Sequence, residues 1–147
     1  MLIRRMTSFD TDKVAIIEKN IFSMPWSKEG FDAAINQENN ILLVAEIEND
    51  IVGYVVMYTS LDEGEITNVA VKTDCRKKHI GDSLIKELKE ISNNKGVKRI
   101  VLEVRVSNKA AISLYEKNKF KKLGTRKNFY EKPREDAFIM ECILEEK

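Results

Sequence analysis

Residues 101–115 read VLEVRVSNKAAISLY, and this stretch is the most informative in the chain. Apolar and polar residues alternate over residues 101–106, which predicts a half-buried strand. A polar turn at residues 107–108 follows, and the apolar pattern after it predicts a helix that contains Tyr115. The strand carries one carboxylate, Glu103. The sequence therefore predicts a proton acceptor and a proton donor on adjacent elements.

Glu103 and Tyr115 each have an ordinary structural explanation when taken alone. A glutamate on a half-buried strand is usually a solvated side chain, and a tyrosine within an apolar helix pattern usually belongs to the core. A catalytic interpretation therefore depends on the rest of the chain.

Composition narrows the class of protein. The 147 residues, 43% hydrophobic and 33% charged, predict one globular domain over residues 1–147. The net charge of +1 gives no overall field that would favour nucleic acid or an anionic membrane. Two distant cysteines and a single histidine argue against a metal site and for a reducing compartment. No stretch resembles a signal peptide or reaches membrane-spanning length, so we expect a cytoplasmic protein with no metal and no membrane partner.

The order of predicted elements indicates a mixed α/β (α+β) domain. The early strands suit an antiparallel meander, and a strand–helix–strand crossover follows in the centre. Ser27 is a candidate helix cap, and Gly96 a candidate helix end. Strands are expected near residues 2–6, 41–47, 51–58, 65–71, 97–106, 120–130 and 137–144, and helices through residues 14–21, after Ser27, and at 80–91 and 108–118.

The segment of residues 72–83, KTDCRKKHIGDS, leads directly into the helix at 80–91. A helix N-terminus offers unpaired backbone N–H groups and a positive dipole end, which suit a phosphate or pyrophosphate. Three basic residues at 76–78 add positive charge, and Gly81 permits close approach of the backbone. A simple solvated basic loop is the alternative. Without an aromatic platform, this loop does not predict direct nucleic-acid binding.

Further motifs lie along the whole chain, and together they support a resemblance. They are residues 68–71 (NVAV), the basic loop with Gly81, residues 103–108 (EVRVSN), residues 114–116 (LYE) with Phe120, residues 25–27 (PWS), residues 126–130 (RKNFY) and residues 134–137 (REDA). In these motifs the chain resembles the GNAT acetyltransferases, and within that family the enzymes that acetylate the N-terminal alanine of a ribosomal protein. The resemblance implies the GNAT fold, with a mixed, mostly antiparallel sheet of about six to seven strands and four flanking helices.

One position departs from the family pattern. The loop of the family typically reads Gln/Arg-x-x-Gly-x-Gly/Ala, and Arg76, His79 and Gly81 occupy the marked positions. The first glycine is thus His79. Histidine tolerates a left-handed backbone better than most side chains, so we expect the loop to keep its cofactor with weaker affinity.

The resemblance implies acetyl-CoA as the acetyl donor and assigns roles to individual residues. The backbone N–H of Val71 would hold the developing oxyanion. Glu103 would accept the proton of the attacking amine, and Tyr115 would donate one to the leaving thiolate. The residues that would bind acetyl-CoA are Val69, Ala70, Val71, Arg76, Lys77, Lys78, His79, Ile80, Gly81, Asp82 and Asn108.

The residues define the amine that accepts the acetyl group less closely than they define the acetyl donor. In the subfamily that the chain resembles, Trp26, Tyr130 and Arg134 would line a slot for a protein N-terminus, although the two aromatic residues could equally be packing residues. Three interpretations stay open at this point. They are an acetyltransferase of the N-terminal alanine of a small-subunit ribosomal protein, a GNAT enzyme for another amine such as a lysine, polyamine or amino sugar, and a catalytically silent acyl-CoA-binding or partner-binding module.

Overall fold

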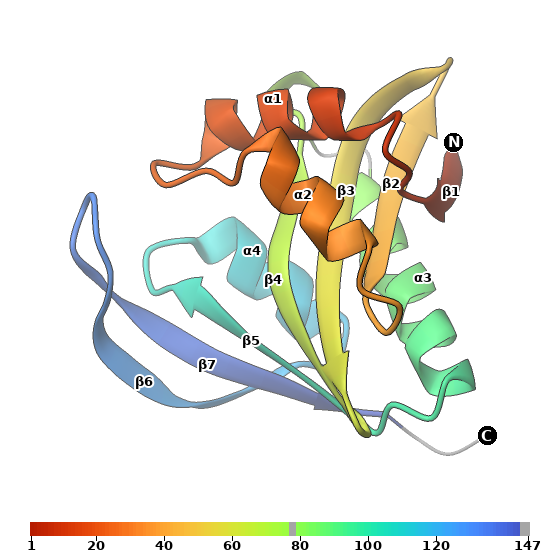
Figure 1. Ribbon diagram of the computed structural model, residues 1–147. Coiled ribbons are helices and arrows are strands. Elements are labelled where there is room, and N and C mark those ends of the chain that lie inside the picture. The colour runs from red at the N-terminus through yellow and green to blue at the C-terminus, as the bar shows by residue number, and fades with distance from the viewer. Residues whose placement is uncertain (77–78, 145–147) are drawn as a thin grey trace.

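The computed structural model describes residues 1–76 and 79–144, which form a seven-stranded sheet flanked by four α-helices (Figure 1). The strand order is β1-β2-β3-β4-β5-β7-β6, and every neighbouring pair is antiparallel except β4 and β5. This confirms the predicted mixed α/β fold. The elements are β1 (Leu2–Arg5), α1 (Thr11–Ile21), α2 (Lys28–Ile35), β2 (Ile41–Ile47), β3 (Asp50–Ser60), β4 (Glu63–Val71), α3 (Ile80–Asn94), β5 (Arg99–Arg105), α4 (Lys109–Lys117), β6 (Lys121–Tyr130) and β7 (Glu135–Ile143).

Helices cover the two faces of the sheet unequally. On one face, α3 and α4 pack over a large core, in which Ile80, Leu84, Ile85 and Leu88 of α3 are buried. Burying each such side chain contributes about 1.5–3 kcal/mol. On the other face, α1 and α2 cover β2, β3 and the end of β4. The part of that face formed by β5, β7 and β6 extends beyond these helices (Figure 1).

The central strands β4 and β5 pair only at their beginnings. Their parallel pairing covers residues 63–65 of β4 and 99–101 of β5, after which the two strands diverge (Figure 1). The divergence follows a β-bulge in β4, where Thr67 is the additional residue between the partners of Val56 and Met57. A bulge bends its strand and increases the local twist. The second half of β4 therefore leaves one edge open toward β5.

Local signals in the sequence account for several element boundaries. Ser27 Oγ accepts a hydrogen bond from the backbone N–H of Gly30 and caps α2, as predicted. The turn between β2 and β3 has positive φ at both Glu48 and Asn49, which matches the right-handed twist of a hairpin. Gly96, at φ +83°, follows the end of α3, where a left-handed residue is expected.

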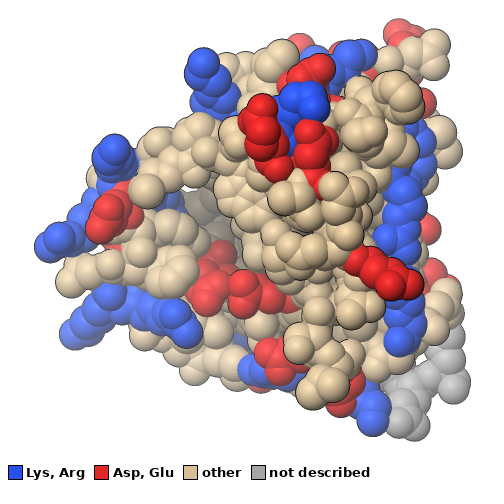
Figure 2. Space-filling model, in the orientation of Figure 1, with Lys and Arg blue, Asp and Glu red and all other residues tan. Residues whose placement is uncertain are grey.

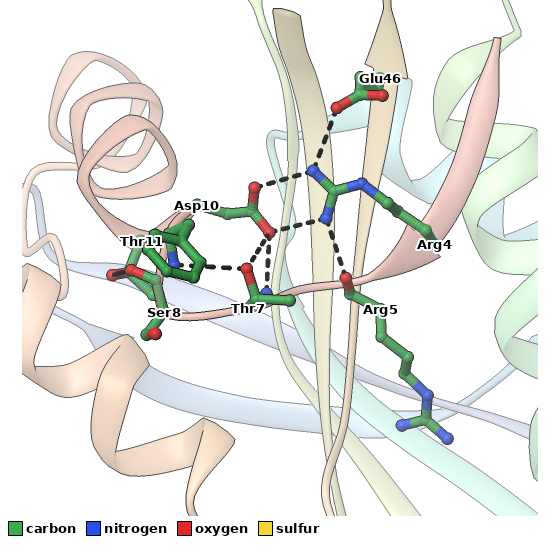
Figure 3. Close-up of polar contacts among 8 residues, drawn as sticks. Arg4, Arg5, Thr7, Ser8, Asp10, Thr11 and Glu46 are labelled. Atoms are coloured by element: carbon green, nitrogen blue, oxygen red, sulfur yellow. Dashed lines mark hydrogen bonds and ion pairs between the residues drawn. The ribbon is translucent and has the colours of Figure 1, made fainter. Parts of the chain in front are cut away.

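A partly buried ion pair connects the first strand to the start of the first helix (Figure 3). The guanidinium of Arg4 donates two hydrogen bonds of 2.8 Å to the carboxylate of Asp10 and one of 3.1 Å to Glu46 on β2. Asp10 also accepts from the backbone N–H of Thr7. These contacts, with that of Arg4 first, lower the pKa of Asp10. Asp10 is the N-cap residue of α1 but makes no side-chain capping hydrogen bond, so its carboxylate anchors β1 and Thr7 to the start of the helix.

Candidate active site

Glu103 lies on β5 and faces the side of the sheet that α1 and α2 leave open. Its neighbours Leu102 and Val104 are buried in the core under α3 and α4, so the alternation of the strand directs Glu103 to the opposite face. Burial raises the pKa of Glu103, and the negative charge of Glu65 on β4 raises it further. The guanidinium of Arg126, whose Nε lies 4.0 Å from Glu103 Oε1, opposes this effect. A carboxylate in this environment is a suitable proton acceptor.

Tyr115 lies on α4, in the core on the other face of the sheet. Its side chain is 4% exposed, and its ring packs 5.6 Å from that of Phe120. Burial raises the pKa of Tyr115, with a smaller contribution from Tyr130. Its hydroxyl forms no hydrogen bond with any residue that the structure describes. Tyr115 therefore keeps its proton at physiological pH and can offer it to a ligand. It flanks β5 from the side opposite to Glu103 and does not contact that carboxylate.

Tyr130, at the end of β6, interacts electrostatically with both Tyr115 and Glu103. Burial raises its pKa to about 12, and Glu103 contributes to the increase. The guanidinium of Arg105 stacks over the Tyr130 ring at 4.4 Å and donates hydrogen bonds to the carbonyl oxygens of Glu131 and Pro133. Glu135 completes the link, because its carboxylate accepts from Arg105. The turn between β6 and β7 is thus tied to the end of β5, beside Glu103.

The open edge of β4 presents backbone groups toward β5. The N–H of Lys72 donates to the carbonyl of Val52 on β3. Because successive residues of a strand direct their peptide groups to opposite sides, those of Val69 and Val71 point away from β3, into the gap. Arg76 reaches the same edge, where its Nε donates to the carbonyl of Val71 at 3.4 Å. This arrangement suits the acetyl-CoA contacts predicted for Val69 and Val71.

The beginning of α3 lies next to this edge. His79 adopts a left-handed backbone, φ 60° and ψ 22°, so it fills the conformation for which the family pattern has glycine. Its side chain makes no capping hydrogen bond, and the first N–H groups of a helix lack intrahelical partners. Packing favours glycine at position 81, since a Cβ there would lie 3.2 Å from the side chain of Leu114. The predicted contributions of Lys77 and Lys78 fall outside the described residues.

Several other predicted residues have evident structural roles. Asn108 caps α4, where its Oδ1 accepts from the N–H of Ala111. The ring of Trp26 packs against Phe31 and, edge-on, against Tyr58.

The remaining predicted residues are either buried or exposed at the surface. Ala70 is buried under α1 and α2, and Ile80 belongs to the core on the other face. Asp82 pairs with Lys86 and accepts a hydrogen bond from Asn118. Arg134 is exposed in the turn between β6 and β7. Their roles toward a ligand stay predictions.

A buried polar cluster under the loop between α1 and α2 was missed from the sequence. Glu18, 2% exposed, accepts hydrogen bonds from the Tyr54 hydroxyl at 2.6 Å, from Asn68 Nδ2 at 3.0 Å and from the backbone N–H of Trp26 at 3.0 Å. Its proximity, after burial, raises the pKa of Tyr54. The sequence does hold a signal for this buried carboxylate, because Glu18 follows Val14 by four residues and so lies on the apolar stripe of α1.

The surface is hollowed between these parts. Figure 2 shows a recess between the side formed by the β6–β7 turn and the side formed by α1 and α2, with acidic side chains along its lower border. In Figure 1 the α1–α2 loop and the β6–β7 turn stand on the same side of the molecule, across the diverging ends of β4 and β5. A proton acceptor, a protonated tyrosine and backbone donors are the groups that acyl transfer to an amine requires, and their position around this gap makes it the candidate active site.

A model of the acetyltransferase (GNAT) family matches residues 11–120. The chain belongs to the GNAT acetyltransferase family and is an acetyl-CoA-dependent acyltransferase. The resemblance inferred from the motifs is thereby confirmed.

Individual relatives have a more specific activity in their names. The chain is 35% identical over 147 residues to the [ribosomal protein bS18]-alanine N-acetyltransferase of Haemophilus influenzae, covering 97% of this chain and 99% of that protein. The corresponding protein of Escherichia coli is 35% identical over 127 residues, 84% of each chain. The crystal structure of the ribosomal-protein-S18-alanine N-acetyltransferase from Escherichia coli superimposes with a TM-score of 0.91 at 30% identity, over 99% of this chain and 95% of that one.

Membrane spans and metal clusters are both absent from the described part of the chain. Residues 1–76 and 79–144 include no helix both long and apolar enough to cross a membrane. In the same residues, no group of three or more His, Cys, Asp or Glu side chains is arranged to hold a metal ion.

Proposed function

We propose that this protein transfers the acetyl group of acetyl-CoA to the N-terminal alanine amine of a small-subunit ribosomal protein. The names of relatives at 35% identity over most of the chain support this acceptor. A cytoplasmic location follows from the same proposal, because ribosomal proteins are made and assembled there. The single observation that carries the chemistry is Glu103, a half-buried carboxylate with a raised pKa beside the gap between β4 and β5.

In this proposal Glu103 activates the amine. An α-amine has a pKa of about 7.7–8.0, so at pH 7 most of it is protonated and cannot attack. Glu103, directly or through a water molecule, accepts the proton, and the neutral nitrogen then attacks the thioester carbonyl carbon. The N–H of Val71, which points into the gap, stabilises the negative charge that develops on the carbonyl oxygen.

Tyr115 assists departure of the thiolate. The carbon–sulfur bond breaks as the carbon–nitrogen bond becomes an amide, and the sulfur gains a proton from Tyr115. A thiol has a pKa of about 8.5, below that of the buried tyrosine, so the transfer is uphill by more than about 2 kcal/mol. A hydrogen bond from Tyr115 to the sulfur lowers the charge on the leaving group before that proton transfer is complete.

A thiol-release assay with two classes of acceptor tests the proposal. Peptides that begin with alanine should be acetylated at the α-amine with a kcat/KM at least about tenfold above that for spermidine or for the same peptide with a blocked N-terminus. Equal turnover of the polyamine, or modification of lysine side chains in the blocked peptide, would favour another acceptor class. Absence of any thiol release with bound acetyl-CoA would favour the silent binding module.

A further inference from the structure

Positive charge is concentrated in one segment of the chain. Residues 117–134 include eight Lys and Arg residues and one acidic residue, Glu131, whereas the remaining residues include 17 basic and 23 acidic ones. The net charge of +1 therefore conceals a strongly basic segment attached to an acidic body. The expectation of no nucleic-acid partner rested on that net charge and on the loop at residues 72–83, and neither bears on this segment.

The basic segment forms an exposed border of the sheet. It comprises β6, which is the last strand in the sheet order, together with the turns at its two ends. Figure 2 shows Lys and Arg side chains along the side of the molecule on which β6 and the β6–β7 turn lie in Figure 1. We name six of its exposed residues the basic rim: Lys119, Lys121, Lys122, Lys127, Lys132 and Arg134.

The charges of the basic rim are not neutralised within the fold. Across residues 1–76 and 79–144, none of the six side chains forms an ion pair. This differs from Arg99 and Arg105, which are paired with carboxylates on β4 and β7. Three of these cations lie on β6, which is about 30 Å long, and three on the turns at its ends. Such a row of unneutralised cations suits a polyanion with regularly spaced charges.

An exposed aromatic ring lies within the basic rim. Phe129 is 43% exposed, and its ring meets that of Tyr130 edge-on at 5.0 Å. The guanidinium of Arg126 lies 5.6 Å from the same ring. An exposed aromatic face among cations stacks nucleobases, whereas an acidic peptide supplies charge without a base to stack. These observations favour RNA over an acidic polypeptide.

We infer that the basic rim binds the phosphate backbone of RNA and that Phe129 stacks one of its bases. The surface adjoins the proposed catalytic site, because Arg126 approaches Glu103 and Tyr130 is held against Arg105. RNA bound at the rim would hold a ribonucleoprotein acceptor beside the gap between β4 and β5. The binding itself is independent of the proposed function and is measured without acetyl-CoA or an acceptor.

Fluorescence anisotropy with a labelled single-stranded RNA of about 20 nucleotides, over a range of salt concentrations, measures this binding with the full chain. The triple variant Lys121→Glu, Lys127→Glu and Lys132→Glu should bind at least about tenfold more weakly than the unmodified protein. Its plot of log K against log salt should be shallower by about 2 to 3, close to one unit for each phosphate that the variant no longer neutralises. Phe129→Ala should weaken binding about fivefold or more at unchanged slope, since stacking of a base on an aromatic ring releases no counterions.

A matched control carries the same change of charge on other surfaces: Lys13→Glu, Lys19→Glu and Lys98→Glu, all at exposed positions. It should bind no more than about threefold more weakly than the unmodified protein. Equal weakening in the two triple variants, or no RNA binding at a salt concentration of about 50 mM, would overturn the inference. Competition by polyglutamate as effective as by RNA at equal charge would reassign the rim to acidic polypeptides. Circular dichroism of each variant shows whether the fold is retained, and Phe129→Ala provides an independent test if a triple variant unfolds.

Discussion

Replacement of Glu18 by alanine should both destabilise the fold and weaken binding of the acceptor. The carboxylate of Glu18 accepts three hydrogen bonds in a buried position, from Tyr54, Asn68 and the backbone of Trp26. The variant leaves three buried donors without an acceptor, each at a cost of about 1–3 kcal/mol. Entry of a water molecule recovers part of this, so we expect the free energy of unfolding to fall by about 3–5 kcal/mol.

Glu18→Gln separates the effect on function from the effect on stability. The amide keeps the shape, and its oxygen can still accept from Asn68 and Trp26, while its NH2 group can donate to the Tyr54 hydroxyl. The free energy of unfolding should fall by about 1–2 kcal/mol, which leaves a folded protein. A neutral amide oxygen accepts more weakly than a carboxylate, so the hydrogen bond from Trp26 that holds the α1–α2 loop weakens in this variant. The KM for an acceptor peptide should therefore rise several-fold, with the KM for acetyl-CoA unchanged.

Urea unfolding followed by circular dichroism, together with steady-state kinetics on a peptide that begins with alanine, measures both effects. The control is Glu87→Ala, which removes an exposed carboxylate on α3 and should change the free energy of unfolding by less than about 0.5 kcal/mol. The reasoning is refuted if Glu18→Ala costs less than about 1 kcal/mol, or if Glu18→Gln raises both KM values together.

Three further predictions follow from the described contacts. Burial raises the pKa of Glu103, and the charge of Arg126 lowers it. In Arg126→Gln the pKa of Glu103 should rise, so the acid limb of the pH profile of kcat/KM should move to higher pH. An unmoved limb would exclude Glu103 as the titrating base. Asp10 has a lowered pKa, so its contribution to stability is present above its unfolded pKa of about 3.9 and is lost as the pH falls through the lower folded value. Asp10→Asn should therefore lower the free energy of unfolding, measured with urea, by about 2–3 kcal/mol at about pH 7 and by progressively less below about pH 4. A difference between variant and unmodified protein that stays constant with pH would contradict the ion pair. Gly53→Ala should lower the free energy of unfolding by about 1–3 kcal/mol, because its Cβ would lie 3.0 Å from a backbone oxygen. Gly124→Ala, at a position with open space around it, should leave that free energy nearly unchanged. Equal thermal midpoints for the two variants would contradict this packing.

Local chemistry in the sequence was enough to predict much of the fold. The helix expected at residues 80–91, the cap at Ser27 and the glycine after α3 depend on contacts within one element or at its ends, and all three formed as expected. The left-handed backbone of His79 agrees with the family pattern, which has glycine at that position. Such features need no knowledge of distant partners.

The geometry of the site depends on contacts between distant segments, and the sequence did not reveal it. The gap between β4 and β5 follows a bulge at Thr67 that only the pairing with β3 defines. Glu18 meets its partners 36 and 50 residues further along the chain. Asn108 was expected to bind the cofactor; the structure shows its Oδ1 as the cap of α4, and its contact with a cofactor stays a prediction. Side chains at turns and caps satisfy nearby backbone groups first, and spacing alone does not separate that role from ligand binding.

The base activity of Glu103 is tested most directly by measuring kcat/KM for acetylation of an alanine peptide in three variants. Glu103→Gln should lower it by about a hundredfold to ten-thousandfold, and Tyr115→Phe should lower kcat, because each removes one proton transfer. Glu65→Gln, which removes the neighbouring carboxylate on β4, should retain activity and shift the acid limb to lower pH, since Glu65 raises the pKa of Glu103. Full turnover by well-folded Glu103→Gln, or an equal loss in Glu65→Gln, would contradict the assignment of Glu103 as the proton acceptor.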